Sequence, residues 1–173
     1  MNTRYDTFWE RFSAGVLDGA VFLPLTLGYS FLLPHANTAV NIIWLFFYVF
    51  ARPVYTILMH GKYGQTLGKM VTGVILLNAN ETRTINYEEA FWREAPVLIM
   101  LIFYVILKVY YSLVPVGHSD TSLMLYDILG YAQLVWFLTE VITMLLNDKR
   151  RALHDYIANT VAIQKKEFAA ANL

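Results

Sequence analysis

Long apolar segments are the feature that most constrains the fold of this chain. An α-helix needs roughly 20 apolar residues to cross the hydrocarbon core of a bilayer. Segments of this kind cover residues 12–33, 38–59, 91–115 and 123–146. Only 15% of the residues are charged, although soluble domains carry about 25%. The sequence therefore predicts an all-α integral membrane protein with four transmembrane helices, organised as a single domain over residues 1–173.

The distribution of Lys and Arg predicts the orientation of these spans. Residues 12–51 and 109–148 contain neither Lys nor Arg. The basic residues gather instead at the N-terminus, in and beside the central loop 60–90, and in the C-terminal tail. Short loops rich in Lys and Arg stay in the cytoplasm. Both termini and the central loop are therefore expected in the cytoplasm, with the turns near His35 and His118 outside.

The central loop and the tail (residues 147–173) contain short runs that favour β-strands. Val74–Leu77 is one such run, Arg83–Ile85 could return beside it, and residues 159–163 form another. Asn86 is expected to cap the helix that leads into the third span. These runs are compatible with a small cytoplasmic sheet and equally with irregular backbone at the membrane interface.

Ionisable residues inside the spans point to a polar site. Such residues are costly in a membrane and usually face the interior of a helix bundle or a wet cavity. Asp18, Arg52 and Glu140 each lie six or seven residues from the cytoplasmic end of a predicted span, or about 9–10 Å at helical rise. Arg11 lies seven residues before Asp18, on the same helix face. If the helices are adjacent, these charges form an acid–base cluster at one level.

Two interpretations of this cluster stay open. In the first, the charges pair and hold the four helices in register, and nothing is transported. In the second, Asp18 and Glu140 form a site for a cation or a proton, and Arg11 and Arg52 tune its charge. Buried carboxylates with basic neighbours suit both interpretations.

Several classes of function have no support in the sequence. The chain has no cysteine, which excludes thiol chemistry and cysteine-ligated metal, and its four histidines share no metal-ligand spacing. A net charge of zero provides no field to recruit nucleic acid. His154 and Asp155 are adjacent, and adjacent residues on a helix point in different directions. We therefore predict no enzymatic activity, no cofactor, no bound metal and no nucleic-acid partner.

Two glycine patterns are more typical of packing than of chemistry. Gly15 and Gly19 have the spacing that lets two membrane helices approach closely. Gly64–Lys69 is short of a phosphate-binding loop, because Tyr63 and Met70 stand where that motif needs Gly and Ser or Thr. Close approach of the backbone to other elements is the expected role of these glycines.

Three motifs follow one another along nearly the whole chain: Phe8–Asp18, Gly64–Lys69 with Gly73, and Arg151–Asp155 with Thr160–Val161. In this order they resemble the RDD family of bacterial membrane proteins, which is named for one arginine and two aspartates. Arg11 matches the arginine, Asp18 the first aspartate and Asp155 the second. The run Val74–Leu77 departs from the family, which often has Arg among the β-prone residues at this point.

The resemblance implies a multi-pass protein of the bacterial inner (cytoplasmic) membrane. It implies no single activity, but cation–proton exchange is associated with some members. The leading hypothesis is membrane transport by a small secondary transporter that exchanges a monovalent cation for protons. Asp18 would be the principal carboxylate, Arg11 and Asp155 would close or tune its cytoplasmic mouth, and Glu140 and Arg52 would assist. Four helices make a small transporter, so a homo-oligomer is expected.

The alternative hypothesis is an accessory or scaffold protein that transports nothing and whose buried charges are structural. The central loop and the basic tail would then bind a partner protein. Membrane lipids surround the chain under both hypotheses, whereas small cations or protons are partners only under the first.

Overall fold

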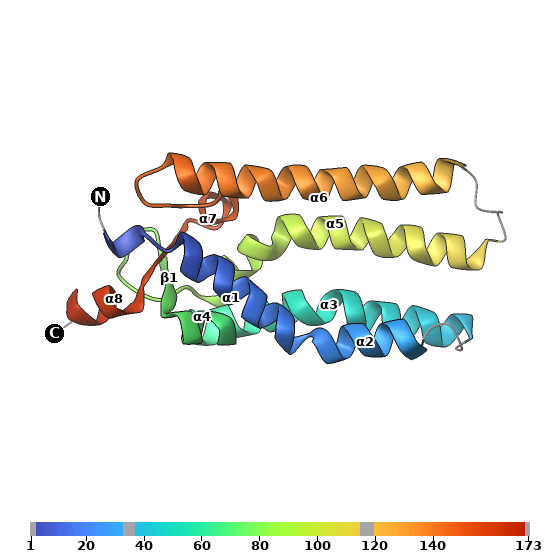
Figure 1. Cartoon of the computed structure of the whole chain (residues 1–173), viewed down its shortest axis with the longest axis horizontal. Coiled ribbons are helices and arrows are strands. Elements are labelled where there is room, and N and C mark those ends of the chain that lie inside the picture. The colour runs from blue at the N-terminus through green and yellow to red at the C-terminus, as the bar shows by residue number, and fades with distance from the viewer. Residues whose placement is uncertain (1–2, 33–36, 115–119, 172–173) are drawn as a thin grey trace.

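The computed structural model describes residues 3–32, 37–114 and 120–171, and its long helices lie side by side as a bundle (Figure 1). These are α1 (Phe8–Val21), α2 (Leu23–Leu32), α3 (Thr38–Tyr63), α5 (Tyr87–Leu113) and α6 (Asp120–Leu146). In these described stretches, three helices are long and apolar enough to cross a membrane, and a fourth span is counted if α1 and α2 together form one. The predicted outward turns at His35 and His118 lie outside the described residues.

The first predicted span is broken rather than continuous. α1 begins at Phe8, and α2 continues it after a bend of 44°. Pro24 explains the break, because it has no N–H to donate to the carbonyl of Ala20 four residues earlier. Proline fits the first turn of a helix, and Pro24 is the second residue of α2.

Local signals account for the ends of α3 and α5. The Asn37 side chain caps α3 by accepting the Val40 N–H at 3.0 Å, and Gly64 ends α3 with a φ of 66°. Pro53 lies inside α3, which runs through it without a break. Asn86 caps α5 as predicted, in a reciprocal arrangement with Glu89.

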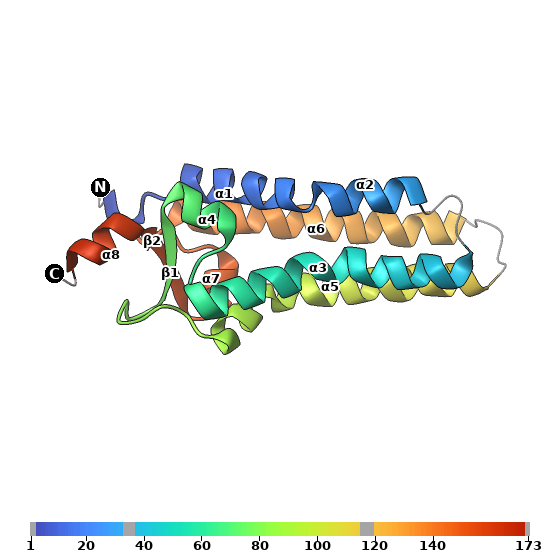
Figure 2. The same ribbon diagram turned by 90° about the horizontal axis from the view of Figure 1, so that it is seen from below.

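Short elements form a layer at the end of the bundle where both termini lie (Figures 1 and 2). This end layer consists of η1 (Thr3–Tyr5), α4 (Leu67–Thr72), β1 (Val74–Asn78), α7 (Leu153–Ile157), β2 (Thr160–Gln164) and α8 (Lys165–Ala171). β1 and β2 pair antiparallel, from Val74 opposite Gln164 to Asn78 opposite Thr160. The small sheet is therefore confirmed, and irregular backbone is the wrong alternative. Arg83–Ile85 adds a single bridge, between Thr84 and Leu77.

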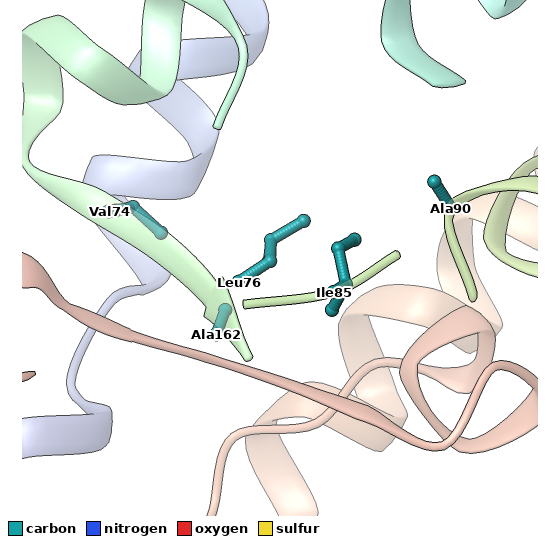
Figure 3. Packing of buried hydrophobic residues seen from close by; sticks show 5 residues of the cluster. All are labelled: Val74, Leu76, Ile85, Ala90 and Ala162. Carbon is teal, nitrogen blue, oxygen red and sulfur yellow. The ribbon is translucent and has the colours of Figure 1, made fainter. Parts of the chain in front are cut away.

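The sheet is buried on both faces, which explains its continuous apolar runs. On one face Val74, Leu76 and Ala162 pack with Ile85, which precedes α5, and with Ala90 in its first turn (Figure 3). The opposite face packs against Tyr5 and Phe168, through the side chains of Ile75, Leu77, Val161 and Ile163. Successive strand residues point to opposite faces, so the sheet ties the central loop to α5, η1 and α8.

Candidate functional site

A buried ion-pair network joins α1 and α5 to the end layer through Asp155, whose side chain is 0% exposed. Asp155 Oδ2 accepts hydrogen bonds from Arg11 Nη2 at 2.8 Å and from the Ala152 N–H at 2.9 Å. Asp155 Oδ1 pairs with Arg93, which also donates to Thr160 on β2. Burial alone would raise the pKa of Asp155, but Arg11 and Arg93 outweigh it and hold that pKa well below its usual range.

His154 extends this network to α6. Its ring contacts Arg93 Nη2 at 2.7 Å and pairs with the Glu140 carboxylate, which also accepts the His154 N–H at 3.1 Å. Burial, followed by the charge of Arg93, lowers the pKa of the His154 ring. The expectation that His154 and Asp155 diverge is wrong, because both side chains reach Arg93 and their polar atoms lie 3.6 Å apart.

Asp18 belongs to a separate network, in which it caps α4. Its carboxylate accepts the Thr66 hydroxyl at 2.6 Å, the Gly68 N–H at 2.8 Å and the Tyr55 hydroxyl at 2.9 Å. The positive end of a helix dipole favours a carboxylate at this position. Within the described part of the chain, Asp18 makes no ion pair with Arg11 or Arg52. The predicted cluster is therefore divided between two networks.

The glycine-rich motif owes its pattern to the contact between α1 and α4. A Cβ on Gly68 would lie 2.2 Å from the Ala14 carbonyl oxygen, so only glycine lets the two helices come this close. Thr66 caps α4 through the Lys69 N–H at 3.3 Å, and Gln65 Nε2 donates to the Val74 carbonyl at 2.6 Å. Each of these residues therefore has a structural use.

An open cavity of about 1450 Å³ lies between α1, α3, α5 and α6. Charged and titratable side chains line one part of it: Arg11, Asp18, Arg52, His60, Lys69, Arg93, Glu94, Glu140 and His154. Four of the five predicted site residues therefore share one cavity, and the fifth, Asp155, is buried behind Arg11 and Arg93. In the remainder of the cavity, the lining is mainly apolar and aromatic.

Among the described residues, Arg52 and Glu94 are the charged cavity residues without a polar partner. Across residues 3–32, 37–114 and 120–171, neither side chain has a hydrogen bond or an ion pair. Arg52, Lys69, Arg93 and Glu140 are the charged groups that act on Glu94. Glu94 is absent from the predicted site, although it is an ionisable residue inside the predicted span 91–115, as Asp18 is inside the first span.

Lys69 is a second titratable group that the predicted site did not include. Its Nζ lies 2.7 Å from His60 Nε2. Burial, then the charges of Arg93 and Arg11, lower the pKa of Lys69 to about 7. An amine with such a pKa gains and loses a proton near neutral pH.

No three His, Asp or Glu side chains of the described residues are grouped as metal ligands.

Comparison with known proteins gives one match. The model of the RDD family matches residues 5–159, a stretch that includes Arg11, Asp18 and Asp155. No curated protein and no solved structure matches the chain.

Proposed function

This chain belongs to the RDD family of bacterial membrane proteins, and from that premise we propose that it is a small secondary transporter of the inner membrane. The proposed topology has four spans, with α1 and α2 as one bent span and both termini in the cytoplasm. The distribution of Lys and Arg supports this orientation. The end layer, which contains the buried Asp155, then lies on the cytoplasmic side.

The proposed activity is exchange of a monovalent cation for a proton, with Glu94 rather than Asp18 as the principal carboxylate. The observation that carries this assignment is that Glu94 lines the cavity without a partner in the described structure. A cation at Asp18 would have to displace three donors from its oxygens. Glu140 is held by His154. Glu94 is the acid that can accept a cation at least cost.

Lys69 supplies the proposed coupling between the cation and the proton. When Lys69 is protonated, its ammonium group compensates the negative charge of Glu94 through space. This positive charge disfavours the binding of Na⁺ or Li⁺ at Glu94. When Lys69 loses its proton, Glu94 is free to bind Na⁺ or Li⁺. With a pKa of about 7 for Lys69, this competition operates near neutral pH. Alkaline conditions on one side should therefore promote cation uptake from that side.

Proton flux in proteoliposomes under an imposed Na⁺ or Li⁺ gradient tests the proposal. Wild-type protein should acidify or alkalise the vesicle lumen according to the direction of the gradient. A Glu94→Gln variant, which keeps the shape of the side chain but not its charge, should lose this response.

The accessory or scaffold role is the second candidate. The contacts of the arginine and the two aspartates that name the family favour this role. Arg11 pairs with Asp155, and Asp18 caps α4. All three thereby attach α1 to the end layer, which requires no transported ion. This role predicts no flux in any variant and stable copurification with another membrane protein.

A further inference from the structure

The cavity opens sideways between α1 and α6. The helices follow one another in an arc, with α2 beside α3, α3 beside α5 and α5 beside α6, which leaves α6 at one edge and the bent pair of α1 and α2 at the other (Figures 1 and 2). Trp9 on α1 is 70% exposed and Phe137 on α6 is 55% exposed, although both line the cavity. Gly15 and Gly19 also line it and have no atom within 4 Å of an added Cβ. An opening on this side of a membrane protein faces the lipids.

Among the residues that the structure describes, the charged part of the cavity presents one cation and one anion without a hydrogen bond or ion pair. Arg52 on α3 and Glu94 on α5 line the same cavity, and neither has a hydrogen bond or ion pair within the described residues. A purely anionic ligand would leave Glu94 unpaired and repelled, and a purely cationic one would do the same to Arg52. A ligand with both charges satisfies both side chains.

The level of this pair in the membrane fits a lipid headgroup. Glu94 is the seventh residue after Tyr87, where α5 begins, or about 10 Å along the helix. Trp92, two residues earlier, is exposed, and tryptophan favours the headgroup level of a bilayer. Beyond the charges, Leu101, Leu129 and Trp136 continue the cavity lining as an apolar wall. A ligand with an acyl chain removes these apolar side chains from water, which is favourable, whereas a small soluble ligand leaves them exposed to water.

We propose that this cavity holds a zwitterionic phospholipid with a primary-amine headgroup, admitted between α1 and α6. Its phosphate pairs with Arg52, its ammonium group donates to Glu94, and one acyl chain lies along the apolar wall. The primary amine is required because a quaternary ammonium has no N–H to donate to the carboxylate. This inference goes beyond the transport proposal and does not depend on it, although the amine and a transported cation would compete for Glu94.

Native mass spectrometry of the purified full chain tests the proposal without any flux measurement. The protein is titrated in detergent with phosphatidylethanolamine, phosphatidylcholine or phosphatidylglycerol. We expect phosphatidylethanolamine to bind about tenfold more tightly than either of the others, the effect of one charge-assisted hydrogen bond. Equal retention of the three lipids overturns the proposal.

Variants and a soluble competitor identify the site and the source of the headgroup. Glu94→Gln should remove the preference, and Arg52→Gln should weaken the binding of all three lipids, whereas Arg52→Lys should keep most of the affinity. Asp127→Asn, an exposed acid on α6 that does not line the cavity, should leave it unchanged. Circular dichroism checks that each variant is folded. A preference that survives Glu94→Gln, unchanged affinities in Arg52→Gln, or displacement of the lipid by an equal concentration of glycerophosphoethanolamine contradicts a lipid site at these residues.

Discussion

Replacing Asp155 with Asn should destabilise the end layer more than any other single loss of charge. The side chain is completely buried and compensates two guanidinium groups, those of Arg11 and Arg93. Asn keeps the size and one acceptor but leaves both cations without a counter-charge. Breaking a buried ion pair by removing one partner costs about 3–5 kcal/mol. Because the second cation is also uncompensated, we expect the upper part of that range.

Chemical unfolding in detergent, followed by tryptophan fluorescence, measures this loss of stability. Asp148→Asn is the matched control, because Asp148 is an exposed acid of the same tail and should change the free energy of unfolding by less than about 0.5 kcal/mol. The pKa of Asp155 is depressed, so its contribution is present above the unfolded value of about 3.9 and is lost as pH falls through the lower folded value. The wild-type network should therefore survive at pH 5. A stability loss below about 1 kcal/mol for Asp155→Asn would refute the reasoning.

Three other perturbations follow from the geometry. Gly68→Ala should lower the melting temperature and expose α4 to proteolysis, because the added Cβ would lie 2.2 Å from a backbone oxygen of α1. Gly130→Ala is the control and should leave the melting temperature unchanged, because no atom lies within 4 Å of a Cβ added there. Asp18→Asn should cost about 1–2 kcal/mol, from the lost charge at the start of α4, and circular dichroism melting would show it. Lys69→Arg should reduce exchange to background throughout pH 6 to 8, because Arg stays protonated where the pKa of Lys69 is about 7 and so keeps the cation from Glu94. Wild-type exchange with an unchanged pH profile would exclude Lys69 as the coupling group.

Features of the fold with local causes were predictable from the sequence. Asn86 caps α5 because its side chain and Glu89 are three residues apart, which is a local pattern. The β-prone runs pair because both have apolar residues at successive positions, as a strand buried on both faces requires. The break at Pro24 was missed, although it also has a local cause, because the hydropathy of the segment is continuous through it.

The candidate site was harder to predict because its partners are not visible as charges. Asp18 was expected to pair with Arg11 or Arg52, but its partner is the start of α4, whose positive potential comes from backbone N–H groups. Arg93 was counted with the basic residues of the central loop, and its burial against Asp155 depends on how α5 and α7 pack. Such contacts join residues more than 60 positions apart, beyond the range of sequence patterns.

Ion flux through reconstituted protein tests the central claim most directly. Proteoliposomes with a pH-sensitive dye in the lumen are given a Na⁺ or Li⁺ gradient and contain wild-type protein, Glu94→Gln or Asp127→Asn. In wild type and Asp127→Asn we predict that protons cross the membrane in the direction opposite to the cation. In Glu94→Gln we predict background proton flux. Equal flux in wild type and Glu94→Gln would contradict the assignment of Glu94, and background flux in wild type would contradict cation–proton exchange itself.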